Sequence, residues 1–95
     1  MDFRPFANKL KEICRDNDIS MLGVFGSAAR GEDTASSDID LLVRLRKPVG
    51  LISLIKLEDT FASLFGRKVD LALEGSIHPL IKKDVVSDLM VIYEE

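Results

Sequence analysis

The segment DIDLLVRL, which begins at Asp38, constrains the fold more than any other part of this sequence. Its apolar residues Ile39, Leu41 and Val43 occupy every second position, with Asp38 and Asp40 on the alternate positions. Successive side chains of a β-strand point to opposite faces of the sheet. The pattern therefore predicts a strand with two sharply different faces, one apolar and one that carries carboxylates.

Hydrophobic periodicity elsewhere predicts the elements that accompany this strand. Apolar residues at three- and four-residue steps from Phe3 to Cys14 indicate a helix, and Gly66 is a plausible stop for a second, largely buried one. The expected strands are 19–25, 38–45, 67–75 and 90–94, and the expected later helices are 51–65 and 79–88. The resulting order α-β-β-α-β-α-β predicts an α+β fold, in which a small mixed β-sheet has its helices packed on one side.

Length and charge limit the classes of protein that remain. The 95 residues fit a single domain spanning 1–95, with little volume for a deep private pocket, so a partner would complete any site. A net charge of −3 argues against direct nucleic-acid binding. Apolar runs of about six residues fall short of the ~20 that a membrane helix needs. No apolar leader is evident and Cys14 has no partner for an internal disulfide, so we expect a cytoplasmic protein.

Three acidic residues lie within the apolar strand segments, where a charged carboxylate is costly unless it serves a function. Asp38 and Asp40 share one strand face, and Asp70 lies between Val69 and Leu71 in the next expected strand. If the two strands pair, their spacing of ~4.8 Å could bring the three carboxylates together. Like charges raise one another's pKa, and a magnesium ion, which prefers oxygen ligands, would relieve the repulsion. A solvated surface is the alternative reading of the Asp-x-Asp pair on its own.

A turn between the first two strands adds a possible phosphate site. Gly26 and Ser27 follow the strand 19–25 and begin a turn or a single helical turn. Gly26 would let the backbone approach a ligand closely, Ser27 could donate a hydrogen bond to a phosphate oxygen, and Arg30 could add positive charge. Alone, these residues fit an ordinary structural turn. Together with the carboxylates they supply the parts that phosphoryl chemistry needs.

The string GSAARGEDTASSDIDLLV resembles the G-S-x10-D-x-D signature of the DNA polymerase β-like nucleotidyltransferases, and VDLAL resembles the segment with their third acid. The short chain is similar to the minimal nucleotidyltransferases, or MNT domain proteins. This resemblance implies that Gly26 and Ser27 hold a nucleotide triphosphate and that Asp38 and Asp40 bind two magnesium ions. Asp70 would bind the catalytic metal and help to deprotonate the acceptor hydroxyl.

The same resemblance implies a function. It suggests Mg²⁺-dependent transfer of AMP from ATP to a protein hydroxyl, with a tyrosine of a HEPN-type toxin as acceptor and this chain as the antitoxin of the pair. Two alternatives stay open. The chain could neutralise its partner by direct binding with a vestigial site, or it could modify the hydroxyl of a small molecule such as an aminoglycoside.

Overall fold

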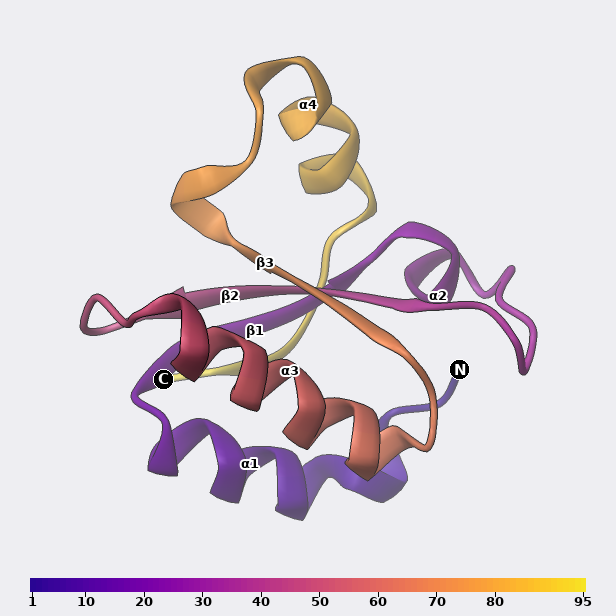
Figure 1. The fold of residues 1–95 in the computed structure, drawn as a ribbon. Helices are drawn as coiled ribbons and strands as arrows, with labels where there is room; N and C mark the ends of the chain where they lie inside the picture. Colours follow the sequence, from indigo (N-terminus) through magenta and orange to yellow (C-terminus); the bar gives the residue numbers. More distant parts are fainter.

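The computed structural model describes all 95 residues and contains the expected elements in the expected order (Figure 1). The strands are β1 (Ile19–Phe25), β2 (Ile39–Leu45), β3 (Val69–Leu73) and β4 (Met90–Glu94). The α-helices are α1 (Ala7–Asp16), α2 (Gly26–Arg30), α3 (Leu51–Phe65) and α4 (Pro79–Asp88), with short 3-10 turns η1 (Arg4–Phe6) and η2 (Glu74–Ser76). The turn after the first strand thus forms the one-turn helix α2.

The four strands form one mixed sheet in the order β3-β2-β1-β4. β1 pairs antiparallel with β2 and with β4, whereas β2 pairs parallel with β3. A parallel pair needs a crossover connection, and α3 supplies it. Glu58 of α3 also reaches the outer edge of β3, where its carboxylate accepts a hydrogen bond of 2.9 Å from the backbone N–H of Leu71. The predicted α+β class and mixed sheet are confirmed.

The main core lies between the sheet and the helices α1 and α3, which run along the same face (Figure 1). The apolar positions Ile39, Leu41 and Val43 of β2 all face this core and are fully buried. Phe61 of α3 and Cys14 of α1 are also fully buried there. Burial of apolar surface on this face is the main source of stability, at roughly 25 cal/mol per Å².

Helix α4 lies on the opposite face of the sheet, which corrects the expectation that the helices pack on one side (Figure 1). Its Val85 packs on Met21 of β1 and Leu42 of β2, and all three are buried. The reason is Leu42, which shares a strand face with the acidic residues yet is 2% exposed. An apolar residue at that position needs a cover, and α4 supplies it.

The helix ends follow simple local rules. His78 caps the start of α4, where its Nδ1 accepts a hydrogen bond of 3.1 Å from the N–H of Leu80. Gly66 ends α3 in the left-handed conformation, with φ of 66°, as expected for a glycine at that position. No helix combines the length and apolar character that spanning a bilayer demands.

Candidate active site

The carboxylates of Asp40 and Asp70 are brought together by the parallel pairing of β2 with β3. The register places these two residues directly opposite each other, and Phe25 of β1 pairs with Asp40 on its other side. Both acids lie at the beginning of their strands, and parallel strands begin at the same end of a sheet. Asp38 precedes β2 by one residue, with its Oδ2 3.7 Å from the Nζ of Lys68.

Partial burial and the close approach of the other carboxylates raise the pKa of Asp40. Partial burial raises the pKa of its carboxyl above the ordinary value, and repulsion from Asp70 and then Asp38 adds to the rise. Arg30 acts in the opposite direction, because its positive charge lowers the same pKa. The Asp40 carboxylate is therefore held in an environment that would be relieved by a cation.

The donor set fits a magnesium ion by its chemistry. All three candidates are carboxylates, which are the ligands that Mg²⁺ takes alongside water and substrate phosphates. In the present arrangement of side chains, no three acidic, histidine or cysteine groups gather closely enough to hold a metal ion. Asp38, Asp40 and Asp70 therefore stay a prediction as metal ligands, supported by the register and by the raised pKa of Asp40.

Gly26 and Asp40 are in close contact where β1 turns into α2. Gly26 has a φ of 71°, in the left-handed region that favours glycine. A Cβ at this position would stand 2.4 Å from Oδ2 of Asp40. Both the backbone conformation and the neighbouring carboxylate thus require glycine. Ser27 follows in the first turn of α2, and its carbonyl accepts from the N–H groups of Gly31 and Glu32 at the end of the helix.

Arg30, the third candidate for nucleotide binding, already has anionic partners. Its Nε donates to Glu32 at 3.1 Å, and its Nη1 donates to Asp88 at the end of α4. The guanidinium therefore links α2 to α4. Because the side chain is 43% exposed, these ion pairs are screened by water and contribute little to stability.

Sequence reasoning missed the pair Asp33 and Arg67. Arg67 lies just before β3 and donates from Nη1 to Asp33 at 2.8 Å and from Nε and Nη2 to the carbonyl of Ser37 at 3.2 and 2.8 Å. The side chain of Arg67 is only 14% exposed and that of Asp33 only 7%. Hydrogen bonds from the chain's amino terminus and from Arg67 lower the pKa of Asp33 to about 2. The only sequence signal was a charged loop, which gives no indication of partners 34 residues apart.

An apolar hollow of about 550 Å³ lies between β3, α3 and α4. The residues that line it include Phe25, Leu54, Ala72, Ile77, Ile81 and Val85. Phe25 directly precedes Gly26, and Ala72 lies two residues after Asp70, on the same strand face. The hollow is therefore next to the carboxylates and has the size and apolar lining of a small-ligand site.

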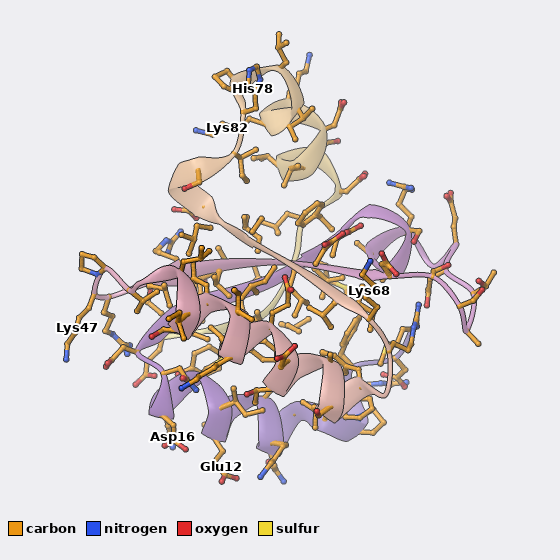
Figure 2. The ribbon with its side chains drawn as sticks, viewed as in Figure 1. Glu12, Asp16, Lys47, Lys68, His78 and Lys82 are labelled. Atoms are coloured by element: carbon orange, nitrogen blue, oxygen red, sulfur yellow. The ribbon has the colours of Figure 1, made fainter.

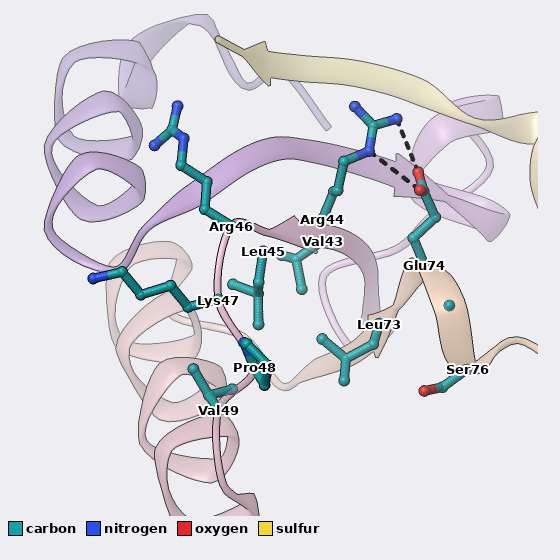
Figure 3. A pocket seen from close by; sticks show the side chains of 11 residues that line it. Val43, Arg44, Leu45, Arg46, Lys47, Pro48, Val49, Leu73, Glu74 and Ser76 are labelled. Carbon is teal, nitrogen blue, oxygen red and sulfur yellow. Dashed lines mark hydrogen bonds and ion pairs between the residues drawn. The ribbon is translucent and has the colours of Figure 1, made fainter.

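A second hollow, of about 460 Å³, lies at the far end of β2 and β3 (Figure 3). Its three cations are each paired: Arg44 with Glu74 and Glu94, Arg46 with Glu95, and Lys47 with Asp18. Lys47 and Lys68, labelled in Figure 2, mark the two ends of the sheet. The carboxylate cluster belongs to the Lys68 end, so the second hollow is a separate feature.

Comparison with known proteins identifies the family of this chain. A family model described as nucleotidyltransferase domain matches residues 7–92. The protein MJ0126 of Methanocaldococcus jannaschii is 41% identical over 83 residues, which cover 86% of this chain and 85% of that protein.

Two further relatives carry functional descriptions. Protein adenylyltransferase MntA of Thermococcus cleftensis is 34% identical over 82 residues, covering 86% of this chain and 83% of that protein. A crystal structure of a toxin-antitoxin with AMP-PNP superposes with a TM-score of 0.80 at 26% identity, covering 94% of this chain and 73% of that one.

Proposed function

This chain belongs to the nucleotidyltransferase domain family, and from that premise we propose that it transfers AMP from ATP to a hydroxyl group of a partner protein. The reaction forms a bond between the acceptor oxygen and the α-phosphorus and releases pyrophosphate. The observation that carries the proposal is the register of β2 and β3, which sets Asp40 opposite Asp70.

Each site residue has a distinct role in this proposal. Asp38 and Asp40 would hold Mg²⁺, as two ions, and Asp70 would hold the ion nearest the acceptor and help to accept the proton of the attacking hydroxyl. Bound Mg²⁺ would supply charge neutralisation and orientation of the phosphates. Gly26 and Ser27 would receive the triphosphate where β1 ends, next to the Asp40 carboxylate.

Arg30 would exchange its present acidic partners for the phosphates of ATP. The side chain is attached to the same one-turn helix as Gly26 and Ser27 and acts electrostatically on Asp40. A guanidinium forms paired, charge-assisted hydrogen bonds with phosphate oxygens as readily as with carboxylates. Arg30 would thus contribute to nucleotide binding without taking part in the bond-forming step.

For the acceptor, we infer a tyrosine of a HEPN-type toxin, with this chain as its antitoxin. The similarity to a protein adenylyltransferase and to a toxin-antitoxin structure with a bound ATP analogue supports AMP transfer within a toxin-antitoxin pair. The HEPN type of the toxin and the tyrosine are what the resemblance to the MNT domain proteins implies. The apolar hollow beside the carboxylates adds a physical reason, because an aromatic ring would find a lining of Phe25, Leu54 and Ile81.

The proposal is tested by incubating the protein with ATP labelled at the α-phosphate, Mg²⁺ and any HEPN-type protein encoded beside it. The wild type is expected to label the partner, and the double variant Asp38→Asn, Asp40→Asn is expected to lose the labelling. Asp59→Asn, which removes an exposed carboxylate from α3, is the matched control. Replacing acceptor tyrosines of the partner by phenylalanine tests the residue type.

Two outcomes would favour the alternatives. Neutralisation of the partner without any labelling, by wild type and double variant alike, would indicate an antitoxin that acts by binding. Labelling of an aminoglycoside in place of the partner would indicate a small-molecule transferase. A double variant that labels the partner at the wild-type rate would contradict the catalytic role of the carboxylates.

A further inference from the structure

The parallel ladder between β2 and β3 does not reach Asp38. Its first pair joins Ile39 to Val69, and one more hydrogen bond of 2.9 Å runs from the N–H of Ile39 to the carbonyl of Lys68. Asp38 therefore lies outside the sheet, at the end of the loop that starts after α2. Its position relative to Asp70 depends on what holds that loop to the start of β3.

Arg67 provides this connection. The side chain sits three residues before Asp70, and two of its nitrogens bind the carbonyl of Ser37, the residue directly before Asp38. The remaining terminal nitrogen binds Asp33 at 2.8 Å, near the other end of the loop. One nearly buried guanidinium thus joins both ends of the loop to the strand that carries the third acid.

We propose that Arg67 is a positioning residue that sets the position of Asp38 relative to Asp40 and Asp70, with Asp33 fixing the orientation of its guanidinium. The inference rests on the proposed function, because it assigns these acids a shared metal site. Arg67 itself touches neither substrate nor metal in this proposal. It acts through the backbone of Ser37.

Hydrogen bonds within the loop help to transmit this restraint. Ser37 donates its N–H to the carbonyl of Thr34 at 3.0 Å, and its hydroxyl accepts from the N–H of Thr34 at 2.9 Å. These bonds close a tight turn immediately before Asp38. A shift of the Ser37 carbonyl is therefore passed to Asp38 instead of being absorbed within the loop.

Arg67 also works against the electrostatic repulsion between the carboxylates of the site. The carboxylates of Asp38, Asp40 and Asp70 repel one another, and no hydrogen bond between them offsets the repulsion. Arginine suits this role better than lysine because its planar fork can bind a carbonyl and a carboxylate at once, in fixed directions. A lysine would keep the charge beside Asp33 and lose the second contact.

The test uses Mn²⁺ as a paramagnetic probe on the full chain, together with assays of AMP transfer. The variants are Arg67→Met, Arg67→Lys and Asp33→Asn, with Arg4→Met as control because Arg4 forms an exposed ion pair with Asp2. The electron paramagnetic resonance signal of free Mn²⁺ falls as the ion binds and gives the half-saturating concentration. In the wild type, Asp38→Asn is expected to weaken Mn²⁺ binding, whereas in the Arg67→Met background the same change should have little further effect.

The expected binding change is a rise of about tenfold in the half-saturating Mn²⁺ concentration for Arg67→Met, the size typical of residues that orient metal ligands. The half-saturating Mn²⁺ concentration of Arg67→Lys should lie between those of Arg67→Met and the wild type. In the transfer assay, kcat should drop for Arg67→Met while the KM for ATP stays within about twofold, because Gly26, Ser27 and Arg30 are untouched. Unfolding curves establish that each variant is folded at the assay temperature.

The inference is overturned if folded Arg67→Met binds Mn²⁺ with the wild-type concentration dependence. It is also overturned if Asp38→Asn weakens Mn²⁺ binding equally in the wild-type and Arg67→Met backgrounds. A wild type whose Mn²⁺ binding depends on both Asp38 and Arg67 but that transfers no AMP contradicts the proposed function and leaves the positioning role supported. The two proposals can therefore fail separately.

Discussion

Gly26 and Asp40 lie so close that a methyl group added to Gly26 would stand 2.4 Å from Oδ2 of Asp40. The two residues are neighbours because Gly26 follows β1 directly and Asp40 pairs with Phe25 at the end of that strand. The turn proposed for the triphosphate and the carboxylate proposed for the metal are thus in contact. A substitution at Gly26 is therefore expected to displace the carboxylate of Asp40.

Replacing Gly26 by alanine is therefore expected to lower both stability and activity. The left-handed backbone alone costs a non-glycine residue about 1–2 kcal/mol, and the contact with Asp40 adds to it. Gly31→Ala is the matched control, because Gly31 has a φ of 72° and open space where the Cβ would be. Urea unfolding should show a larger loss for Gly26→Ala, and equal losses would contradict the importance of the contact.

Replacing Asp40 by asparagine should stabilise the protein while abolishing AMP transfer. The raised pKa means that the folded state favours a neutral group there, so the charge present at pH 7 opposes folding. We expect a small gain in the free energy of unfolding, because water screens the charge of this partly buried side chain. Thermal unfolding without metal measures it, and a lower melting temperature than wild type would contradict the expectation.

Added magnesium should make the wild type more stable than Asp40→Asn, which reverses the order expected without metal. A metal that binds only the folded wild type raises its stability in proportion to RT ln(1 + [Mg²⁺]/Kd). The melting temperature of the wild type is therefore expected to rise with added MgCl₂, whereas that of Asp40→Asn should change much less. Asp59→Asn, measured alongside, should respond as the wild type does.

Much of the fold could be predicted from local patterns. The alternation in DIDLLVRL indicates the correct faces of β2, because a two-residue period with one apolar face is typical of a half-buried strand. Gly66 and the proline after His78 mark helix boundaries through backbone rules that act within a few residues. The pairing of β2 with β3, on which the expected cluster of carboxylates depends, is confirmed by the register.

Burial of Cys14 gives a prediction about alkaline pH. Burial first, and then the negative charge of Glu95, raise the pKa of its thiol from 9.0 to about 12. In the folded state the thiol therefore keeps its proton to higher pH than in the unfolded state. The free energy of unfolding should fall as the pH rises from about 9 to about 12.

The contribution of this thiol is isolated by comparison with Cys14→Ala, since other groups titrate over the same range. The difference in unfolding free energy between the two proteins should shrink steadily above about pH 9. Iodoacetamide should react with the folded wild type far more slowly than with the urea-unfolded chain at the same pH. Equal reaction rates would contradict the buried, protonated state of Cys14.

Replacing Arg30 by methionine tests its proposed contact with the triphosphate. Steady-state kinetics should give a KM for ATP that rises several-fold with a smaller change in kcat, because the contact is expected in both the ground state and the transition state. Asp88→Asn removes one acidic partner of Arg30 and should leave or lower the KM. An unchanged KM for ATP in Arg30→Met would indicate that Arg30 joins α2 to α4 and does not bind the nucleotide.

What the sequence could not reveal are contacts between distant residues. Nothing local distinguishes Asp33 and Arg67 from the other charged residues, because their role appears only once the loop and β3 lie side by side. The same holds for Leu42, whose burial under α4 depends on a helix that starts far later in the chain. Long-range pairing of polar groups and two-sided covering of a sheet both arise from tertiary structure.

The hydrogen bond from Leu71 to Glu58 limits how an acceptor can reach Asp70. An open strand edge readily pairs with an extended segment of another chain. At β3 the outward N–H next to Asp70 is already taken by a carboxylate, which also repels approaching carbonyl groups. A partner cannot add a strand there without displacing Glu58. The modified hydroxyl is therefore expected to project into the site as a side chain, crossing the face of the sheet beside α4.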